Sequence, residues 1–248
     1  VWKTTNRGDS WEKISNINSY NKIRALAIAP SNTDVLYATD HNDLYRTQDG
    51  GENWTNISNG LPSNAVTYIA VKSNDANTLW VTLSGYDANT VYESVDGGDT
   101  WTNISDGLPE LPATSIVHDK VSVNEQILYT GTRIGVYIKV DDNPWESYNT
   151  NLPNVRIDEL EIYYNEENHA NSRLRAATYG RGLWETPVKV NETYPPSLTT
   201  EQASDITQTS ATLKASINND YGEDITESGF LFARNAQVNY DNACIFRN

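Results

Sequence analysis

Short runs of alternating or β-branched apolar residues recur along the first three-quarters of the chain, and each run is bounded by Gly, Asn, Asp or Pro. Alternation with a period of two predicts β-strands. No segment shows the apolar period of an amphipathic helix. The runs fall into three repeated sets. The first set lies at residues 23–30, 66–73, 115–123 and 157–164, and the second at residues 35–40, 78–83, 127–132 and 173–178. The third set lies at residues 1–4, 44–47, 91–94, 136–139 and 183–186.

A fourth repeated segment completes each unit with the pattern S/T-x-D/N-x-G-x-x-W. Its Trp residues follow one another at steps of 43, 47 and 44 residues. Four strands in a unit of this length are typical of a β-propeller blade. The sequence therefore predicts an all-β fold, a β-propeller of four-stranded blades that forms a partial ring of about four blades. The copies are TTNRGDSWEKIS (4–15), TQDGGENWTNIS (47–58), SVDGGDTWTNIS (94–105) and KVDDNPWESY (139–148), which is shorter and lacks the Gly.

The repeated motif predicts a tight hairpin between the third and fourth strands of each blade. Its Asp can accept hydrogen bonds from nearby backbone N–H groups and so close the turn. Its Gly occupies a position where the backbone needs a positive φ, and its Trp is expected to fold under the hairpin as an apolar plug. The residues assigned to this structural role are Asn6, Gly8, Trp11, Asp49, Gly51, Trp54, Asp96, Gly98, Trp101, Asp141 and Trp145.

The tripeptide Arg7-Gly8-Asp9 lies in the first copy of the motif. In other proteins this tripeptide can be an integrin-binding loop. Here Gly8 stands where the hairpin requires a Gly, and its two neighbours occupy exposed, variable positions of the turn. We therefore interpret the tripeptide as a consequence of turn chemistry, and integrin binding is not expected.

The hairpin motifs resemble Asp boxes, also called BNR repeats, over residues 1 to about 187. Asp boxes occur in sialidases, in xyloglucan-cleaving glycoside hydrolases and in sortilin-type receptors. The resemblance implies a propeller and leaves its activity open. A sialidase needs a cluster of three arginines and a Tyr–Glu pair, and the Arg-Ile-Pro start of that family is absent, so sialidase activity is not expected.

Candidate site residues lie in the turns between second and third strands. Those turns, with the connections between blades, share the face opposite the repeated hairpins, where propeller sites are usually built. Spacing does not show which of these residues converge, because they come from different blades, and turns favour Asp and Asn for conformational reasons alone. The candidates are Asp40, Asp43 and Asp87 for acid–base catalysis and Tyr86, Arg133, Tyr179 and Arg181 for binding.

The pattern changes after the propeller. Residues 190–200 are rich in Pro and Thr and predict a linker between a propeller domain at 1–189 and a second domain at 201–248. Two alternating runs at 206–217 and 225–234 predict strands. They are similar to the first strands of fibronectin type III-like modules in secreted proteins of Bacteroidota, some of which use type IX secretion. The second domain is short for such a sandwich, so an incomplete module is expected.

The composition and net charge of the chain limit the partners and sites it can have. The net charge of −15 and the pI near 4.5 argue against nucleic-acid binding. No apolar run is long enough to span a membrane. The lone Cys244 excludes an intramolecular disulfide and a Cys-based zinc cluster. No cofactor or metal site is expected, although surface carboxylates leave Ca²⁺ open. Since the chain contains no Met, we expect it to be part of a longer polypeptide.

These observations favour a non-catalytic binding or display propeller of a large secreted or cell-surface bacterial protein. The expected partner is a glycan, or a protein of the cell surface or of the secretion machinery. The alternative is a fragment of a propeller glycoside hydrolase, which requires two carboxylates about 5–10 Å apart in a cleft. A third hypothesis is a sortilin-like peptide receptor, for which an apolar tunnel wall is expected.

Overall fold

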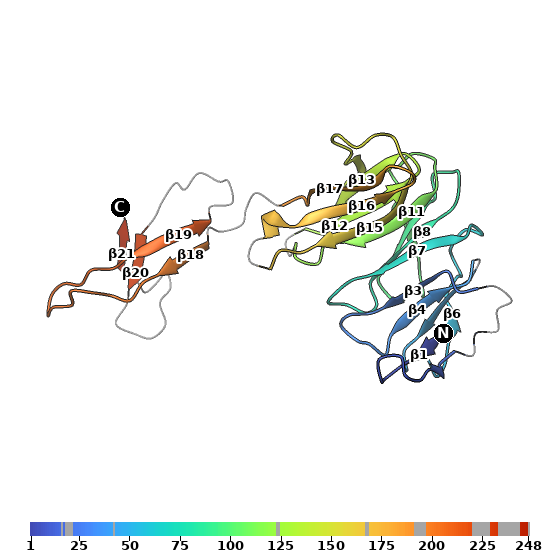
Figure 1. Cartoon of the computed structure of the whole chain (residues 1–248), viewed down its shortest axis with the longest axis horizontal. Coiled ribbons are helices and arrows are strands. Elements are labelled where there is room, and N and C mark those ends of the chain that lie inside the picture. The colour runs from blue at the N-terminus through green and yellow to red at the C-terminus, as the bar shows by residue number, and fades with distance from the viewer. Residues whose placement is uncertain are drawn as a thin grey trace. The chain divides into compact units, whose positions relative to one another are not determined.

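The computed structural model describes residues 1–15, 17, 22–41, 43–122, 125–166, 169–190, 197–219, 229–232 and 244–247. The chain divides into two compact units, Val1–Lys189 and Val190–Asn248, and Figure 1 shows the ribbon. Apart from one turn of 3-10 helix, η1 (His169–Asn171), the regular structure of the described residues is entirely β.

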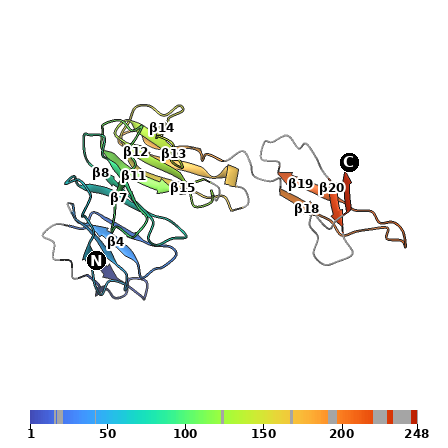
Figure 2. The ribbon, with the colours of Figure 1, turned by 180° about the vertical axis from the view of Figure 1, so that it is seen from behind.

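The first unit is a succession of antiparallel sheets, each built from strands that follow one another in sequence (Figures 1 and 2). The first sheet has two strands, the next three have four each and the fifth has three. This arrangement confirms the prediction of a propeller of four-stranded blades. The strands, grouped by blade, are β1 (Trp2–Lys3) and β2 (Glu12–Lys13); β3 (Ala25–Ile28), β4 (Leu36–Thr39), β5 (Leu44–Thr47) and β6 (Thr55–Asn56); β7 (Val66–Val71), β8 (Leu79–Leu83), β9 (Val91–Ser94) and β10 (Thr102–Asn103); β11 (Ala113–His118), β12 (Ile127–Thr132), β13 (Gly135–Val140) and β14 (Glu146–Ser147); and β15 (Ile157–Tyr163), β16 (Arg173–Thr178) and β17 (Gly182–Pro187).

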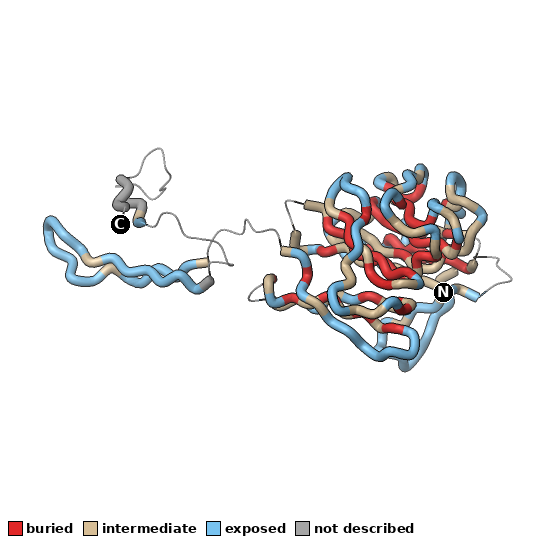
Figure 3. The backbone as a smooth tube through the Cα atoms, turned by 90° about the horizontal axis from the view of Figure 1, so that it is seen from above, coloured by how far each residue is buried: buried red, intermediate tan, exposed pale blue. Residues whose placement is uncertain are grey.

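The core of this unit lies between neighbouring blades, and Figure 3 shows its buried residues in red. The second strand of a blade is the most deeply buried, and every residue of β4, β8 and β12 is buried. Because such a strand has a strand on each side and a sheet above and below it, both of its faces carry apolar or small side chains. Trp80 of β8 and Tyr129 of β12 are fully buried in this way.

The hairpins between third and fourth strands are closed by an Asp and a hydroxyl. In the second blade, Asn53 N donates to Asp49 Oδ1 at 2.9 Å, and Thr47 Oγ1 donates to the same oxygen at 2.7 Å. Gly51 N donates to Thr47 Oγ1 at 3.0 Å. The hydrogen bond from the Asn53 backbone, with those from the two side chains, lowers the pKa of Asp49 to about 2.

The third blade repeats this geometry. Thr100 N and Ser94 Oγ donate to Asp96 Oδ1 at 2.9 and 2.8 Å, and Gly98 N donates to Ser94 Oγ at 2.7 Å. Hydrogen bonds from the side chain and backbone of Thr100 lower the pKa of Asp96 to about 2. Gly98 has a φ of 96°, and a Cβ there would lie 2.4 Å from Ile57 of the preceding blade. Only Gly satisfies both the backbone conformation and this close approach.

Each hairpin Trp also joins its blade to the preceding one. The Nε1 atoms of Trp54, Trp101 and Trp145 donate to backbone carbonyls in the preceding blade, at 3.0, 3.0 and 2.6 Å. The accepting residues are Ile14, Ile57 and Ile104, which stand three residues after a hairpin Trp. The Trp is therefore part of the interface between blades as well as of its own hairpin.

The first hairpin differs from the others in its Trp. Asn6 Oδ1 accepts a hydrogen bond from Ser10 N at 3.0 Å, so Asn6 takes the place of the Asp. Gly8 has a φ of 98° and Arg7 a φ of 59°. Trp11, however, is 59% exposed, whereas an apolar plug was expected. The reason is that, among the described residues, no sheet precedes this hairpin for the indole to pack on.

In the second unit, β18 (Ser197–Thr200) pairs with β19 (Ala215–Asn219), and β20 (Gly229–Phe232) pairs with β21 (Cys244–Arg247). The strand predicted at 206–217 begins only at Ala215, so the prediction was wrong for the residues before it. Ile206 is 71% exposed, because no second sheet among the described residues covers that face. Four residues of the predicted linker form β18, and the predicted strand at 225–234 lies in part outside the described residues.

Candidate functional site

The two edges of the blades carry different loops. Gly50 N donates to Asp34 O at 2.9 Å and Gly97 N to Asn77 O at 2.8 Å. These bonds place the repeated hairpins beside the turns between first and second strands, on what we call the hairpin face. At the opposite ends of the strands, Ser84 N donates to Ala65 O at 3.0 Å. There the turns between second and third strands meet the connections between blades, and we call this the loop face.

Two arginine–tyrosine pairs lie on the loop face. Arg133, in the β12–β13 turn, has its guanidinium carbon 5.4 Å from the ring centroid of Tyr86 in the β8–β9 turn. Arg156, at the end of the connection into the fifth blade, is 4.4 Å from the ring centroid of Tyr179 in the β16–β17 turn. Tyr86 is 64% exposed and Tyr179 is 66% exposed. Each pair thus presents an exposed aromatic ring beside a cation.

Three of the four predicted binding residues belong to these pairs, and the structure adds Arg156. Sequence reasoning missed Arg156 because it lies in a connection, with no motif around it. Tyr179 N donates to Arg156 O at 2.9 Å, so the β16–β17 turn and the connection are also joined through the backbone. The position of Arg156 at the end of a blade connection is the only sequence signal that could have found it.

Arg181, the fourth predicted binding residue, lies in the same turn as Tyr179. It is exposed and stands between Gly180 and Gly182, whose φ angles are 75° and 77°. Its carbonyl accepts a hydrogen bond from Trp184 Nε1 at 2.9 Å. Arg181 therefore places a further cationic side chain in the turn that carries Tyr179.

The three predicted catalytic carboxylates all accept hydrogen bonds, two from their own turns and one from the neighbouring strand β6. Asp40 is buried, and its Oδ1 accepts a hydrogen bond from Asp43 N at 3.1 Å. Asp43 Oδ1 accepts from Asn56 Nδ2 at 2.9 Å. Asp87 Oδ1 accepts from Asn89 N at 2.8 Å. Turn conformation therefore explains the Asp at positions 40 and 87, which is the alternative that the sequence left open, whereas Asp43 is tied to β6.

A buried Ser–His–Asp cluster joins the fourth and fifth blades on the hairpin face. His169 Nε2 lies 3.0 Å from Asp119 Oδ2, and His169 Nδ1 lies 3.1 Å from Ser172 Oγ. All three residues are buried. Because a substrate cannot reach them, we interpret the cluster as a contact between the first-to-second turns of two blades.

His118 lies nearby at the end of β11, and its ring stacks on Trp80 at 4.9 Å between centroids. Burial, together with the charge of Lys72, lowers the pKa of His118 to about 4. The residue is therefore neutral at physiological pH and lies partly buried at the end of β11.

The residues that the structure describes contain no group of three or more His, Cys, Asp or Glu side chains suited to a metal ion. Among those same residues, none of the helical structure is long and apolar enough to cross a membrane.

Comparisons with known proteins agree on the propeller. A family model described as Sortilin-Vps10 (sortilin, neurotensin receptor 3) matches residues 1–164. No curated protein matches the chain. The structure of the GH74 enzyme from Niastella koreensis is 17% identical with a TM-score of 0.57, and the match covers 75% of this chain and 32% of that one.

Two further solved structures have the same fold. The GH74 xyloglucanase from Xanthomonas campestris is 15% identical with a TM-score of 0.56, and the match covers 75% of this chain and 33% of that one. The extracellular domain of a one-component system from B. thetaiotaomicron is 17% identical with a TM-score of 0.51, over 71% of this chain and 22% of that one. The matched part thus spans a third or less of each relative, and at these identities the likeness shows the fold alone.

Proposed function

The chain belongs to the Sortilin-Vps10 family, and from that premise we propose that it is an extracellular binding propeller whose loop face takes up a glycan or a protein. The observation that supports this most is the pair of exposed rings, Tyr86 and Tyr179, each beside an arginine. Tyr and Arg are enriched in binding interfaces, because they combine large apolar area with directed hydrogen bonding.

The chemistry of the two pairs favours a ligand with hydroxyl or carboxylate groups. The negative face of a Tyr ring attracts weakly positive C–H groups, such as those of a sugar ring. A guanidinium donates several hydrogen bonds in a fixed plane and holds its charge at any physiological pH. Arg133 and Arg156 are already placed beside the rings, so less conformational freedom is lost when a ligand binds.

The surrounding features support an extracellular setting. One structure with this fold is an extracellular domain, and two are GH74 enzymes, one of them a xyloglucanase. We propose on the same grounds that the hairpins are Asp boxes, that 1–189 is the propeller domain, and that 201–248 belongs to a fibronectin type III-like module. We propose that the chain belongs to a bacterial surface or secreted protein that is exported by type IX secretion. Ca²⁺ stays open as an accessory ligand.

The test is a glycan-array screen and a pull-down with the chain, followed by titration of each ligand found. Replacing both loop-face tyrosines, in the double variant Tyr86→Ala/Tyr179→Ala, is expected to weaken binding at least about tenfold, as for truncated interface hot spots. Tyr163→Ala is the matched control, because Arg175 lies 4.7 Å from the Tyr163 ring, at the hairpin-face end of β15. Equal losses in the two variants would refute the loop face as the site.

A glycoside hydrolase acting on polysaccharide remains the second candidate, favoured by the likeness to GH74 folds. It requires a pair of carboxylates acting as acid and base. Asp40 and Asp87 accept hydrogen bonds from their own turns and Asp43 accepts one from Asn56 of β6, which speaks for binding without turnover. Release of reducing sugar from xyloglucan, abolished in a folded Asp87→Asn variant, would establish the hydrolase instead.

A further inference from the structure

The two arginine–tyrosine pairs of the loop face differ in how the charge of the arginine is compensated. Arg156 Nε lies 2.6 Å from Asp158 Oδ1, so this arginine forms an ion pair with a nearby carboxylate. Arg133 forms no ion pair with any carboxylate that the structure describes. The positive charge of Arg133 is therefore uncompensated, and it lies beside the exposed ring of Tyr86.

The acidic residue next to Tyr86 in the chain is held by other groups. Asp87 Oδ1 accepts a hydrogen bond from Asn89 N at 2.8 Å, and Asp87 Oδ2 accepts one from Asn64 Nδ2 at 3.4 Å. Both donors belong to the loop face, and they hold the carboxylate within the β8–β9 turn. Asp87 thus has hydrogen-bond partners of its own, and the guanidinium of Arg133 keeps its donors for a ligand.

Arg181, in the β16–β17 turn, is a second arginine of this kind. It is exposed, and no carboxylate of the described residues forms an ion pair with it. The chain has 33 Asp and Glu against 18 Lys and Arg, so acidic partners for an arginine are abundant. A guanidinium pairs with a carboxylate through two parallel hydrogen bonds, and the group that complements these arginines is therefore a carboxylate.

The turns that carry these residues belong to three consecutive blades whose first strands are joined near the loop face. Thr67 Oγ1 of β7 donates to Ala113 O of β11 at 2.7 Å, and Thr114 Oγ1 of β11 donates to Ile157 O of β15 at 2.6 Å. These bonds keep the three turns in a fixed order around the face. Such an arrangement suits an extended ligand of several units, because the protein loses little freedom on binding it.

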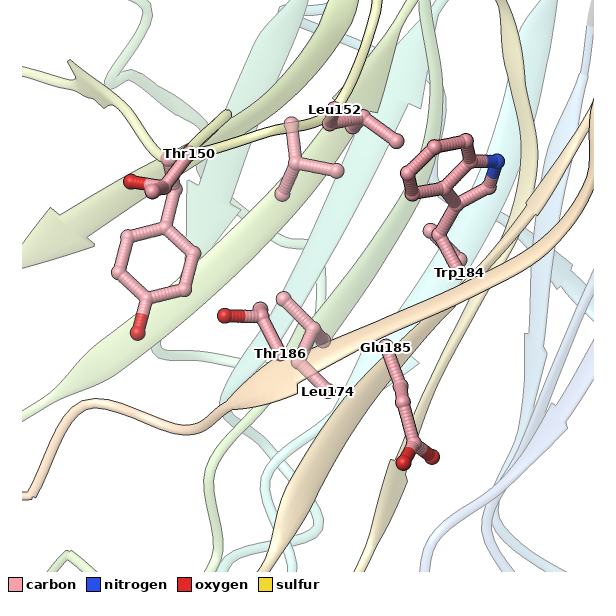
Figure 4. A pocket seen from close by; sticks show the side chains of 9 residues that line it. Thr150, Leu152, Leu174, Trp184, Glu185 and Thr186 are labelled. Atoms are coloured by element: carbon pink, nitrogen blue, oxygen red, sulfur yellow. The ribbon is translucent and has the colours of Figure 1, made fainter.

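An enclosed pocket does not provide the binding site near the second pair. The hollow between the fourth and fifth blades, shown in Figure 4 with the side chains of Leu152 and Trp184 on its wall, has a volume of about 30 Å³. This is about the share of liquid volume that one water molecule takes, and a sugar ring is too large for it. A ligand of the loop face therefore lies on the exposed rings themselves.

We propose, on the basis of the function proposed above, that the ligand of the loop face is an acidic glycan. The carboxylate of one sugar unit pairs with Arg133, and the ring of that unit contacts Tyr86. The C–H groups of a sugar ring are attracted to the negative face of an aromatic ring. Further units of the glycan contact Tyr179, where Arg181 is available to a second carboxylate.

An acidic peptide also offers carboxylates, but it fits this face less well. Its acidic side chains present no sugar-like rings to Tyr86 and Tyr179. A dense run of carboxylates is also repelled by the net charge of −15. In a glycan whose acidic units alternate with neutral ones, the charges are farther apart and this repulsion is smaller.

The test measures binding of the full chain to an oligosaccharide in which glucuronate alternates with N-acetylglucosamine, and to the carboxyl-reduced form of the same oligosaccharide, by isothermal titration calorimetry. The two forms differ only at the carboxylate. We expect the acidic form to bind at least about tenfold more tightly, as for a hydrogen bond to a charged group. Both measurements use the unmodified chain, so the comparison does not depend on any variant folding.

Variants of the two pairs then assign the carboxylate contact. Arg133→Gln should remove most of the preference for the acidic form. The double variant Arg156→Gln/Asp158→Asn removes the other arginine together with its partner, so it should weaken both forms by the same factor and keep the preference. Arg175→Gln, in the arginine–tyrosine pair near the hairpin face, is the charge-matched control and should change neither affinity.

Equal affinity of the unmodified chain for the two forms would overturn the acidic glycan and leave the binding of glycans by the loop face intact. Failure of both forms to bind would also overturn it, and the glycan-array screen then decides separately whether the loop face binds another ligand. A polyglutamate peptide that binds as tightly as the acidic form would assign the face to an acidic peptide instead. An equal loss of preference in Arg133→Gln and Arg175→Gln would attribute the preference to net charge and contradict the role of Arg133.

Discussion

The hairpin face and the loop face of the propeller are built from similar turn residues, but they use them differently. On the hairpin face, Asp49 and Asp96 accept hydrogen bonds from their own turns, and each Trp after the first contacts the preceding blade. On the loop face, Tyr86 and Tyr179 are largely exposed. The Asp and Trp side chains of the hairpin face contact the fold, whereas the Tyr side chains of the loop face are exposed to solvent.

We infer from this difference that the face on which a residue lies, and not its residue type, decides its role in this chain. Tyr163 and Arg175 form an arginine–tyrosine pair near the hairpin face, with the same chemistry as the pairs on the loop face. Substitutions on the hairpin face should therefore change stability and leave binding intact. Substitutions on the loop face should do the reverse, and each prediction below tests one side of that division.

The largest expected effect is that of Trp145→Ala on the hairpin face. The side chain is buried between two blades, so its removal should lower the free energy of unfolding by about 3–5 kcal/mol. Urea denaturation followed by circular dichroism measures the change. Trp11→Ala is the matched control, and since Trp11 is mostly exposed it should cost less than about 1 kcal/mol. Equal costs would contradict the burial of Trp145 between two blades.

The second prediction concerns the pH dependence of stability through His118. Its pKa in the folded protein is about 4 because burial disfavours the charged ring, whereas the unfolded chain takes up the proton near pH 6.5. The stability that this group contributes is thus complete above pH 6.5 and is lost as the pH falls towards 4, by about 3 kcal/mol. Unfolding free energies of the protein and of His118→Asn, compared across that range, should converge at low pH.

A smaller effect is expected from Arg156→Lys on the loop face. Lysine keeps the charge but loses the planar stacking on Tyr179, so ligand affinity should fall about 2–5-fold with unchanged stability. Isothermal titration with the ligand found by screening measures this change. Arg175→Lys alters the corresponding pair on the hairpin face and should leave affinity unchanged. A loss in both variants would mean that the two faces do not differ in function.

The smallest effect is expected for Asp96→Asn in acid. Hydrogen bonds in the hairpin lower the folded pKa of Asp96 to about 2, so its contribution is present above the ordinary carboxyl pKa and is lost as the pH falls through the folded value. The unfolding midpoint of the protein should drop towards that of Asp96→Asn between about pH 4 and 2. A constant difference between the two proteins over that range would contradict the hydrogen-bonding pattern of the turn.

Much of the propeller could be predicted from the sequence, because its hairpins depend on local chemistry. A Gly with a positive φ, an Asp that closes the turn and a Trp at a fixed distance leave a pattern that repeats with the blade. Whether a given Trp is buried could not be predicted in the same way. Trp11 and Trp145 occupy equivalent positions in the motif, and only the presence of a neighbouring sheet separates them.

The candidate site was less predictable, because it depends on contacts between blades. Tyr86 and Arg133 could be named as polar turn residues, but their approach across two turns follows from the packing of the sheets. Arg156 was missed because it lies in a connection with no motif around it, next to a turn of the same blade. Ile206 shows the converse limit: an alternating run predicts a strand only where a second layer exists to cover its apolar face.

Hydrogen exchange in the presence and absence of a ligand tests the division between the two faces most directly. On ligand binding, we predict slower amide exchange in residues 84–90, 131–136 and 178–183 of the loop face, and no change in the hairpins at 47–54 and 94–101. Protection confined to the hairpins, with the three loop-face turns unaffected, would contradict the account.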